Sequence, residues 1–121
     1  MKYGNRKIVR DGIKFDSLKE YRRFCELSLL EKAGKVTDLQ LQKEFVLIPA
    51  QYETFERYGK TGKRLQDGKR CIEKSCVYKA DFCYVQDGKQ IVEDTKGVKT
   101  KDYIIKRKLM LWVHGIKITE I

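Results

Sequence analysis

The sequence has few of the residues and runs that mark several common classes of protein. His114 is the only histidine, and of the four cysteines only Cys71 and Cys76 are close in sequence, whereas structural zinc motifs usually show two tight ligand pairs. Because no export signal precedes them, we interpret the cysteines as reduced, small core or surface residues. No stretch approaches the roughly 18–20 apolar residues of a membrane span, so we expect a cytoplasmic protein with no membrane partner.

Internal repeats and low-complexity tracts are also missing, and 121 residues with 41% hydrophobic content leave room for a single core. We therefore predict one domain over 1–121, with a basic N-terminal segment at 1–14 and a basic loop or hairpin insertion at 51–70. The GKTGKR segment of this insertion does not match a phosphate-binding P-loop, because no glycine stands five residues before Gly59 or Gly62 and no Ser or Thr follows Lys63.

Acidic residues are outnumbered, with 17 Asp and Glu against 27 Lys and Arg, and the net charge is +10. This excess predicts a polyanionic partner such as nucleic acid, the alternative being a soluble basic protein. Tyr52, Phe55 and Tyr58 alternate with charged residues in the insertion, as a nucleic-acid contact requires, although a solvated loop would look similar. The cations expected at nucleic acid are Lys60, Lys63, Arg64, Lys69, Arg70, Lys99, Lys101, Lys106 and Arg107.

Periodicity and capping residues predict the order α-β-β-β-α-β, which describes an α/β (α+β) fold with a small mixed sheet flanked by helices. Ser17 and Thr100 are the expected helix N-caps, Gly34 and Gly115 follow the helix ends, and Pro49, the only proline, stops the first strand. The expected elements are a helix from about Ser17 to Ala33, a strand over Val36–Ile48, a hairpin whose first strand starts near Ile72, a helix from about Lys101 to His114, and a strand over Ile116–Ile121.

Apolar stripes at helical or strand spacing predict the core. They are Leu18, Tyr21, Cys25 and Leu29 on the first helix, Ile105, Leu109, Trp112 and Val113 on the second, and Leu39, Leu41, Phe45 and Leu47 on one face of the first strand. Glu20, Phe24 and Leu27 form a second stripe on the first helix. If this stripe touches the sheet, Glu20 points at it; alternatively, Glu20 only completes a capping box with Ser17.

The segment Tyr78–Gly97 carries the strongest hairpin signal, because Asp87-Gly88 separates two runs rich in β-branched and aromatic residues. With a two-residue turn, opposed residues have numbers that sum to 175, so Asp81 faces Asp94. Lys96 points to the same side as Asp94, because side chains two apart on a strand share a face. Two carboxylates directly opposite each other repel, so something should offset that repulsion.

Paired carboxylates can share a proton, pair with a lysine in a cross-strand salt bridge, or bind a divalent cation. Mg²⁺ fits because it is usually held by one or two protein carboxylates, with water and substrate phosphate as the other ligands. Lys96 could then orient a water and stabilise developing negative charge, and the Thr95 carbonyl could add an oxygen. Glu93 lies on the opposite strand face and is expected at the surface or against a helix.

Asp81 followed by Asp94-Thr95-Lys96, within this element order and with a glutamate on the first helix, resembles the PD-(D/E)xK nuclease superfamily. Four segments are similar, in order and across nearly the whole chain, to a family of small phage-encoded endonuclease-like proteins related to Holliday-junction resolvases. They read GIKFDSLKEYRRFCEL, KAGKVTDLQLQKEFVLIP, YKADFCYVQDGKQIVEDTKG and TKDYIIKRKL. One departure is that Lys79-Ala80 precede Asp81, where the superfamily's name has a proline.

The resemblance implies a restriction-endonuclease-like domain with Asp81 and Asp94 as ligands of Mg²⁺ or Mn²⁺, Lys96 as the catalytic lysine, and Glu20 as an acid that contacts the metal or its water. Gln42 is a possible neighbour of the site. The resulting hypothesis is a DNA endonuclease that hydrolyses phosphodiester bonds by in-line attack of a metal-activated water. Its expected substrate is branched DNA such as a Holliday junction, in the cytoplasm of a phage or prophage host.

Symmetric cutting of a junction needs two sites, so a homodimer is expected. Two alternatives stay open from the sequence. One is a non-catalytic nucleic-acid-binding module that keeps the basic surface. The other is a restriction-type or nicking nuclease that acts on linear duplex DNA.

Overall fold

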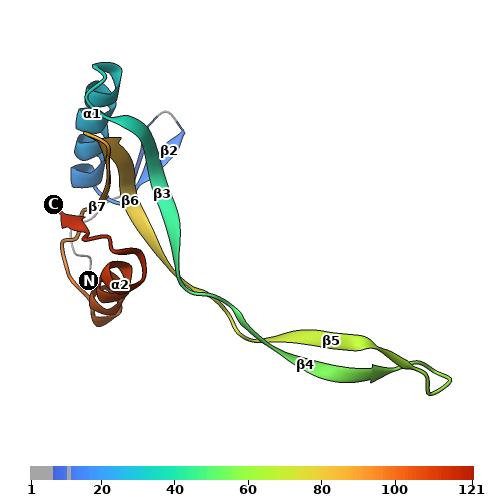
Figure 1. Cartoon of the computed structure of the whole chain (residues 1–121). Coiled ribbons are helices and arrows are strands. Elements are labelled where there is room, and N and C mark those ends of the chain that lie inside the picture. Colours follow the sequence, from blue (N-terminus) through green and yellow to red (C-terminus); the bar gives the residue numbers. More distant parts are fainter. Residues whose placement is uncertain (1–6, 11) are drawn as a thin grey trace.

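The computed structural model describes residues 7–10 and 12–121 and shows a mixed α+β fold, as the sequence predicted (Figure 1). Of the predicted N-terminal segment at 1–14, residues 1–6 and 11 lie outside the described residues, and the remainder contributes to a short hairpin. The elements are β1 (Ile8–Arg10), β2 (Ile13–Phe15), α1 (Leu18–Lys32), β3 (Thr37–Ile48), β4 (Gln51–Tyr58), β5 (Arg64–Glu73), β6 (Cys76–Gln86), β7 (Lys89–Asp94), α2 (Lys101–His114) and β8 (Thr119–Glu120).

A four-stranded sheet in the order β3-β6-β7-β8 forms the body of the molecule. The pairs β3–β6 and β6–β7 are antiparallel and β7–β8 is parallel, so the sheet is mixed. The helices and sheet strands therefore follow one another as α1-β3-β6-β7-α2-β8. Strands β4 and β5 form a separate two-stranded sheet between β3 and β6 in the sequence.

The predicted register of the β6–β7 hairpin is confirmed. Cys83 pairs with Val92 and Gln86 pairs with Lys89, which leaves Asp87 and Gly88 as a two-residue turn. Both turn residues have positive φ, 52° and 75°, as the hairpin turn whose twist matches the strands requires.

The predicted helix ends are also confirmed. The Ser17 hydroxyl accepts a hydrogen bond from the Glu20 amide (3.1 Å), and the Thr100 hydroxyl accepts one from the Tyr103 amide (3.1 Å). Gly34 and Gly115 follow the two helices with φ of 75° and 68°, a left-handed conformation that glycine adopts without steric cost. None of the helices within the described ranges is long and apolar enough to cross a membrane.

The core stripe predicted for α1 is wrong at both ends, because Leu18 and Leu29 are exposed. The helix instead buries Glu20 and Leu27, the stripe that the sequence analysis considered second. Polar contacts explain the choice, since Glu20 reaches the end of the sheet and Arg23 pairs with the buried Glu93 of β7. These contacts rotate the helix away from its more apolar stripe.

The stripe predicted for α2 is wrong at three of its four positions, and only Leu109 packs against the core. Ile105 and Val113 are exposed and Trp112 is 86% exposed, whereas Tyr103 and Met110 are buried. The hydroxyl of Tyr103 donates to Glu120 of β8 at 2.6 Å, and this contact turns the Tyr103 face of the helix toward the sheet.

The prediction that β3 presents one apolar face is wrong because the strand is irregular at Gln42, whose φ is 55°. Phe45 and Leu47 belong to a core cluster with Tyr103 and Met110 of α2. Leu39 and Leu41 instead pack against a second cluster around Leu27 of α1. The body therefore has one core on each side of the sheet, and the register places Asp81 opposite Gln42, where the two cores meet.

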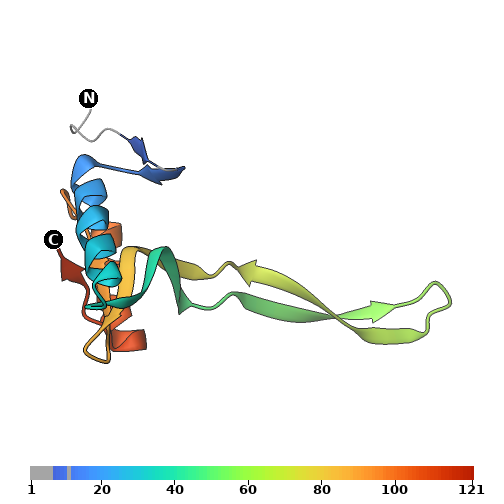
Figure 2. The same cartoon turned by 90° about the horizontal axis from the view of Figure 1, so that it is seen from above.

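Residues 51–73, which include the insertion at 51–70, form a hairpin that extends away from the body (Figures 1 and 2). We call this hairpin of β4 and β5 the arm. Every residue of β4 is exposed, as is every residue of β5 except Gly68. At the root of the arm, His114 Nε2 lies 2.7 Å from the carbonyl oxygen of Val46.

Candidate active site

A cleft of about 720 Å³ opens where β7 ends and the N-termini of both helices converge. It gathers residues from three distant parts of the sequence. The lining residues are Asp16, Ser17, Glu20, Asp81, Asp94, Thr95, Lys96, Gly97, Val98 and Thr100. All four residues predicted as catalytic are among them.

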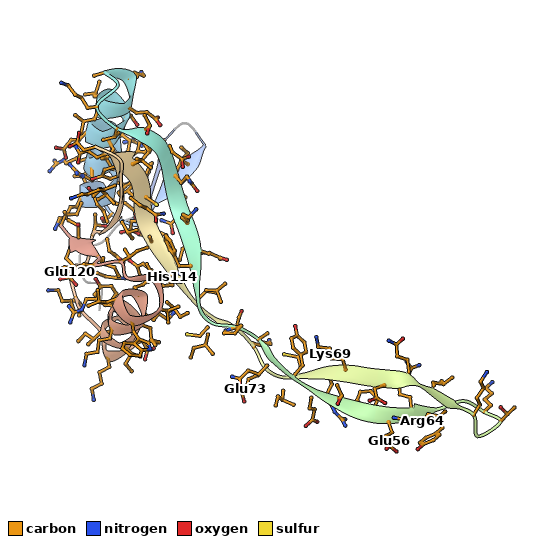
Figure 3. All side chains as sticks on the ribbon, viewed as in Figure 1. Glu56, Arg64, Lys69, Glu73, His114 and Glu120 are labelled. Atoms are coloured by element: carbon orange, nitrogen blue, oxygen red, sulfur yellow. The ribbon has the colours of Figure 1, made fainter. Side chains whose placement is uncertain are left out.

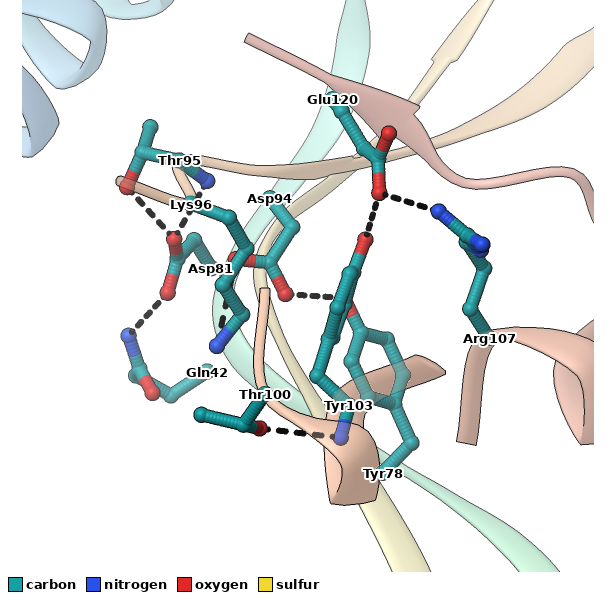
Figure 4. A network of polar contacts seen from close by, with 10 residues as sticks. All are labelled: Gln42, Tyr78, Asp81, Asp94, Thr95, Lys96, Thr100, Tyr103, Arg107 and Glu120. Atoms are coloured by element: carbon teal, nitrogen blue, oxygen red, sulfur yellow. Dashed lines mark hydrogen bonds and ion pairs between the residues drawn. The ribbon is translucent and has the colours of Figure 1, made fainter. Parts of the chain in front are cut away.

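Asp94, the last residue of β7, is 1% exposed and lies in a cluster of polar groups (Figure 4). Its carboxylate accepts a hydrogen bond from the Tyr78 hydroxyl at 2.5 Å, and Lys96 Nζ lies 3.7 Å away. Burial raises the pKa of Asp94 to about 6, with repulsion from Asp81 adding to the effect and the tyrosine and lysine opposing it. Burial thus makes the negative charge of Asp94 costly in the absence of a cation.

Asp81 lies on β6 one step beyond the Phe82–Glu93 pair, opposite Asp94 in the register of the hairpin. One carboxylate oxygen accepts hydrogen bonds from the amide and the hydroxyl of Thr95, at 2.8 and 2.7 Å. The other oxygen lies 3.5 Å from Nε2 of Gln42, so the residue predicted as a possible neighbour does reach the site. These contacts fix the orientation of the Asp81 side chain.

Glu20 takes part in the helix cap and also lines the cleft. Its backbone amide completes the Ser17 cap, while its carboxylate accepts from the backbone amide of Asp16 at 2.9 Å, one residue before the capping-box partner. The side chain is 2% exposed, and burial raises its pKa to about 7, with hydrogen bonding to Asp81 and repulsion from it contributing. Glu20 therefore lies beside Asp81 in the cleft, and its contact with a metal or with metal-bound water stays a prediction.

Lys96 follows β7 and, within residues 7–10 and 12–121, carries the only cationic side chain that lines the cleft. Its ammonium lies 4.9 Å from the centre of the Tyr103 ring, a cation–π contact that holds the side chain over α2. Tyr103 is held in turn by Glu120, which also accepts from Arg107 at 3.1 Å (Figure 4). Lys96 is thus positioned from both β7 and α2.

The opposite face of β7 carries a separate polar cluster. Glu93 is 1% exposed and forms a bidentate pair with Arg23 of α1, at 2.8 and 2.6 Å, and also accepts from the Tyr84 hydroxyl. Glu93 is therefore helix-facing, one of the two positions expected for it, and lies outside the cleft.

The predicted nucleic-acid cations divide between two regions. Lys60, Lys63, Arg64, Lys69 and Arg70 lie on the arm (Figure 3). Lys99, Lys101, Lys106 and Arg107 lie on or just before α2, and two of these, Lys99 and Arg107, pair with Glu120 at 3.1 Å. Lys99 and Lys101 flank Thr100, which lines the cleft, whereas the arm group lies on the hairpin that extends away from the body.

Among residues 7–10 and 12–121, no group of three or more His, Cys, Asp or Glu side chains has the arrangement of a ready-made metal site. The donor chemistry nevertheless suits a hard cation, because Asp81 and Asp94 are adjacent, Glu20 is beside Asp81, and all three offer carboxylate oxygens. Among the described residues that line the cleft, Lys96 is the one cation, against four carboxylates when Asp16 is included. The cleft therefore offers the hard oxygen donors that Mg²⁺ or Mn²⁺ prefers.

Three contributors to the site were missed by the sequence analysis. Tyr78 hydrogen-bonds Asp94, the Thr95 side chain hydrogen-bonds Asp81, and Tyr103 packs against Lys96. Only the carbonyl of Thr95 was considered from the sequence, although its hydroxyl stands between two predicted site residues. Tyr78 and Tyr103 gave no such signal, because their hydroxyls reach the site only through the way the strands and α2 pack.

Comparisons with known proteins identify a family for the chain. Neither curated proteins nor solved structures gave a match. One family model matches residues 1–118, nearly the whole chain. The chain therefore belongs to the family described as "Protein of unknown function (DUF1064)".

Proposed function

We propose that the protein is a metal-dependent DNA endonuclease that hydrolyses phosphodiester bonds in branched DNA. The observation that carries this proposal is the convergence of Glu20, Asp81, Asp94 and Lys96 on one cleft, from helix α1, strand β6 and the end of β7. Three carboxylates beside one amine provide ligands for a divalent cation and a group that handles negative charge.

When bound, Mg²⁺ or Mn²⁺ supplies a Lewis acid that makes water a stronger nucleophile and offsets the charge of the phosphate. Asp81 and Asp94 would hold the cation, with Glu20 as a third acid beside Asp81. The Tyr78 hydroxyl and the two hydrogen bonds from Thr95 fix the two aspartates before any ligand arrives. Such preorganisation lowers the cost of arranging the reacting groups.

Lys96 would orient the attacking water and stabilise the charge that develops on the phosphate oxygens. Its ammonium is 3.7 Å from Asp94, so it acts next to the carboxylate that would hold the cation. Lys101 and Lys106 on α2 would bind flanking phosphates, which gives salt-dependent binding with little sequence preference.

The order of the helices and strands in the body supports the same proposal of a nuclease. Without β1, β2 and the arm, α1-β3-β6-β7-α2-β8 has the order expected for a restriction-endonuclease-like core, with its acids on the second and third strands. Branched DNA is the substrate that the resemblance to Holliday-junction resolvases implies. Two copies of the chain would then cut opposite strands of a junction in the cytoplasm of a phage host.

The test is a panel of four-way junctions, flaps, nicked duplexes, linear duplexes and single strands, each incubated with the purified protein and Mg²⁺ or Mn²⁺. We expect cleavage of the junction, abolished by EDTA. Asp94→Ala and Lys96→Ala should each reduce the rate at least 100-fold, a loss of about 3 kcal/mol in transition-state stabilisation, while junction binding persists. Asp102→Ala, which removes an exposed aspartate of α2, is the matched control and should cleave normally.

Two other outcomes would redirect the proposal. If every substrate stays intact with both metals while binding persists, the protein is a non-catalytic nucleic-acid-binding module, an alternative that the basic arm favours. If linear duplex is cut as fast as the junction, the protein is a restriction-type or nicking nuclease. Unfolding of Asp94→Ala and Lys96→Ala would instead identify their contact as a structural salt bridge.

A further inference from the structure

The arm contributes almost no surface to the core, yet its two strands pair along nearly their whole length. All eight residues of β4 are exposed, and Gly68 is the one buried residue of β5. A two-stranded hairpin alone in water is only marginally stable, so an arm of this length needs its own internal contacts and a reason to extend. The side chains of the arm show these internal contacts and also a reason for the arm to extend.

Cross-strand contacts stiffen the arm on both of its faces. On one face Lys69 Nζ lies 4.3 Å from the centre of the Tyr52 ring. On the other, the Arg70 guanidinium lies 4.6 Å from the centre of the Phe55 ring and pairs with Glu53 at 2.7 Å. These aromatic and charged pairs between β4 and β5 make the arm a ribbon rather than a loop.

Gly68 and Phe55 form the tightest of these contacts. The two residues are directly paired, and a Cβ atom added to Gly68 would lie 2.2 Å from the Phe55 ring. The far end of the Phe55 ring therefore lies directly over the glycine, which is the buried residue of β5. Only glycine permits that approach.

Positive charge concentrates at the end of the arm that is farthest from the body. Residues 57–66 include four cations and no carboxylate. Within the described part of the chain, only Arg64 of these four forms an ion pair, with Asp67 at 2.6 Å. The other three, Arg57, Lys60 and Lys63, have no carboxylate partner there and are free to contact an external anion.

The dimensions of the arm suit duplex DNA. Eight residue steps separate Gln51 from Gly59, the last residue of β4's side that bonds across the arm, and at about 3.3 Å per residue this end lies about 26 Å from the root. One turn of B-DNA is about 34–36 Å long, so the paired part of the arm spans roughly three-quarters of a turn. A two-stranded ribbon also fits the major groove, which is about 12 Å wide.

We propose that the arm is a second DNA contact that lies along the groove of the duplex and binds phosphates roughly three-quarters of a helical turn from the body. This inference rests on the proposed function for the identity of the ligand as DNA. It adds that the preferred substrate has a duplex segment of at least roughly three-quarters of a turn on the arm side of the branch, because a shorter segment does not reach the tip.

The test compares two variants that remove the same charge, both built on the cleavage-inactive Asp94→Asn protein. Lys60→Gln/Lys63→Gln removes two unpaired cations from the tip, and Lys32→Gln/Lys35→Gln removes two exposed lysines from the far end of α1. Affinity for a 40-base-pair duplex is measured by fluorescence anisotropy across a salt series. Each phosphate contact contributes about 0.9 to the slope of log K against log[salt], so the tip variant should lower the slope by about two and the control should not.

A second series shortens the duplex. We expect the difference between the tip variant and its parent to shrink as the duplex falls below roughly three-quarters of a turn beyond the footprint of the body. Equal slopes for the two double variants, or a difference that does not depend on duplex length, would overturn the inference. A tip variant that binds DNA like its parent but changes the mass in sedimentation would show that the arm contacts a second copy of the chain, and would overturn it too.

These outcomes are separable from those of the proposed function. If the Asp94→Asn protein binds no duplex or junction at all, both proposals fail. If wild type cuts no substrate while the tip variant still lowers the salt slope, the nuclease proposal fails and the arm inference stands. If wild type cuts junctions and the slopes are equal, only the arm inference fails.

Discussion

At the scale of single residues, the site depends on how its carboxylates are held. Asp94 is 1% exposed, and its polar surroundings are the Tyr78 hydroxyl, Lys96 and Asp81. A buried carboxylate that loses a hydrogen-bond donor loses both stability and orientation, because water cannot replace the donor. Tyr78 is therefore a positioning residue, and its hydroxyl can be removed without changing the shape of the core.

Tyr78→Phe should lower the free energy of unfolding by about 1.5–3 kcal/mol, the usual worth of a hydrogen bond to a charged group. It should also raise the Mg²⁺ concentration that gives half-maximal cleavage, because Asp94 is no longer held in place. Urea denaturation and a Mg²⁺ titration of the cleavage rate measure the two effects.

Tyr84→Phe is the matched control, because Tyr84 donates to Glu93 on the other face of β7. It should lose stability to a similar degree and keep the Mg²⁺ dependence of wild type. If both variants change the Mg²⁺ dependence equally, the effect comes from general loosening of the sheet, and Tyr78 has no specific role.

Residue-level prediction succeeded where local geometry dictated the outcome. The Asp87-Gly88 turn fixed the register, and the register alone placed Asp81 opposite Asp94. The contact of Tyr78 with Asp94 was missed because strict alternation along β6 places Tyr78 on the opposite strand face from Asp81. The irregularity at Gln42, on the paired strand, has no sequence signature, and it accompanies the change of face that brings Tyr78 to Asp94.

At the scale of elements, helix ends were predictable and helix orientation was not. Caps such as Ser17 and Gly115 act on neighbouring residues, so their effect can be read locally. The buried face of a helix depends on partners that are distant in sequence. For α2 the decisive partner is Glu120, which binds Tyr103 and thereby leaves Trp112 in solvent.

The contact between α2 and β8 gives a pH-dependent prediction. Hydrogen bonds from Tyr103 and Lys99 lower the pKa of Glu120 to about 2. A folded-state pKa below the unfolded value of 4.5 means that Glu120 stabilises the fold above about pH 4.5 and that this contribution is lost as the pH falls toward 2. Glu120→Gln should therefore have a lower melting temperature than wild type at pH 7.

The difference between Glu120→Gln and wild type should narrow steadily between about pH 4.5 and pH 2, because the wild-type carboxyl becomes neutral over that range. Differential scanning fluorimetry at a series of pH values measures it. Glu44→Gln, at an exposed acid of β3, is the control and should show a smaller difference at every pH. If the difference in melting temperature between Glu120→Gln and wild type does not change with pH, the charge of Glu120 does not contribute to the contact.

The arm gives a second prediction for an element. Gly68→Ala would place a methyl group 2.2 Å from the Phe55 ring, so the ring must leave its position and the pairing of β4 with β5 should weaken. Because the arm is exposed, the loss should stay local, with a change of less than about 1 kcal/mol in global unfolding. Hydrogen exchange should show faster exchange of β4 and β5 amides and unchanged protection in β6 and β7.

Adding Phe55→Ala to Gly68→Ala removes the clash and should restore part of the protection in the arm. If Gly68→Ala alone leaves exchange in the arm unchanged, Phe55 is not packed over the glycine in solution. If Gly68→Ala also lowers the protection of amides throughout the four-stranded sheet of the body, the arm and the body unfold as one unit.

At the scale of the whole molecule, the position of the arm in the chain was predictable from the sequence, whereas its two-stranded structure was not. The mixture of glycines, aromatics and cations in residues 51–70 suits a loop as well as a ribbon, and only the pairing of Phe55 with Gly68 and of Tyr52 with Cys71 decides between them. The two-core arrangement was also unpredictable. It arises where β3 and β6 change faces at Gln42 and Asp81, and it leaves the carboxylates at the boundary between the two cores.

That position makes metal binding a property of the whole fold. Asp81 and Asp94 come from the sheet and Glu20 from α1, so a cation that all three contact would tie the helix to the sheet. A ligand that binds only the folded state stabilises it by RT ln(1 + [L]/Kd), which is about 1.4 kcal/mol at ten times Kd. Mg²⁺ should therefore raise the melting temperature by roughly 3–6 °C over NaCl of equal ionic strength.

The rise in melting temperature should disappear in Asp81→Asn, which keeps an oxygen for the Thr95 hydrogen bonds but loses the charge that attracts the cation. It should persist in Asp102→Asn, which removes an exposed carboxylate outside the cleft. Equal rises in all three proteins would mean that Mg²⁺ stabilises the fold by binding outside the cleft. Because the measurement needs no DNA, a rise confined to proteins with an intact cleft would establish the metal site independently of any cleavage assay.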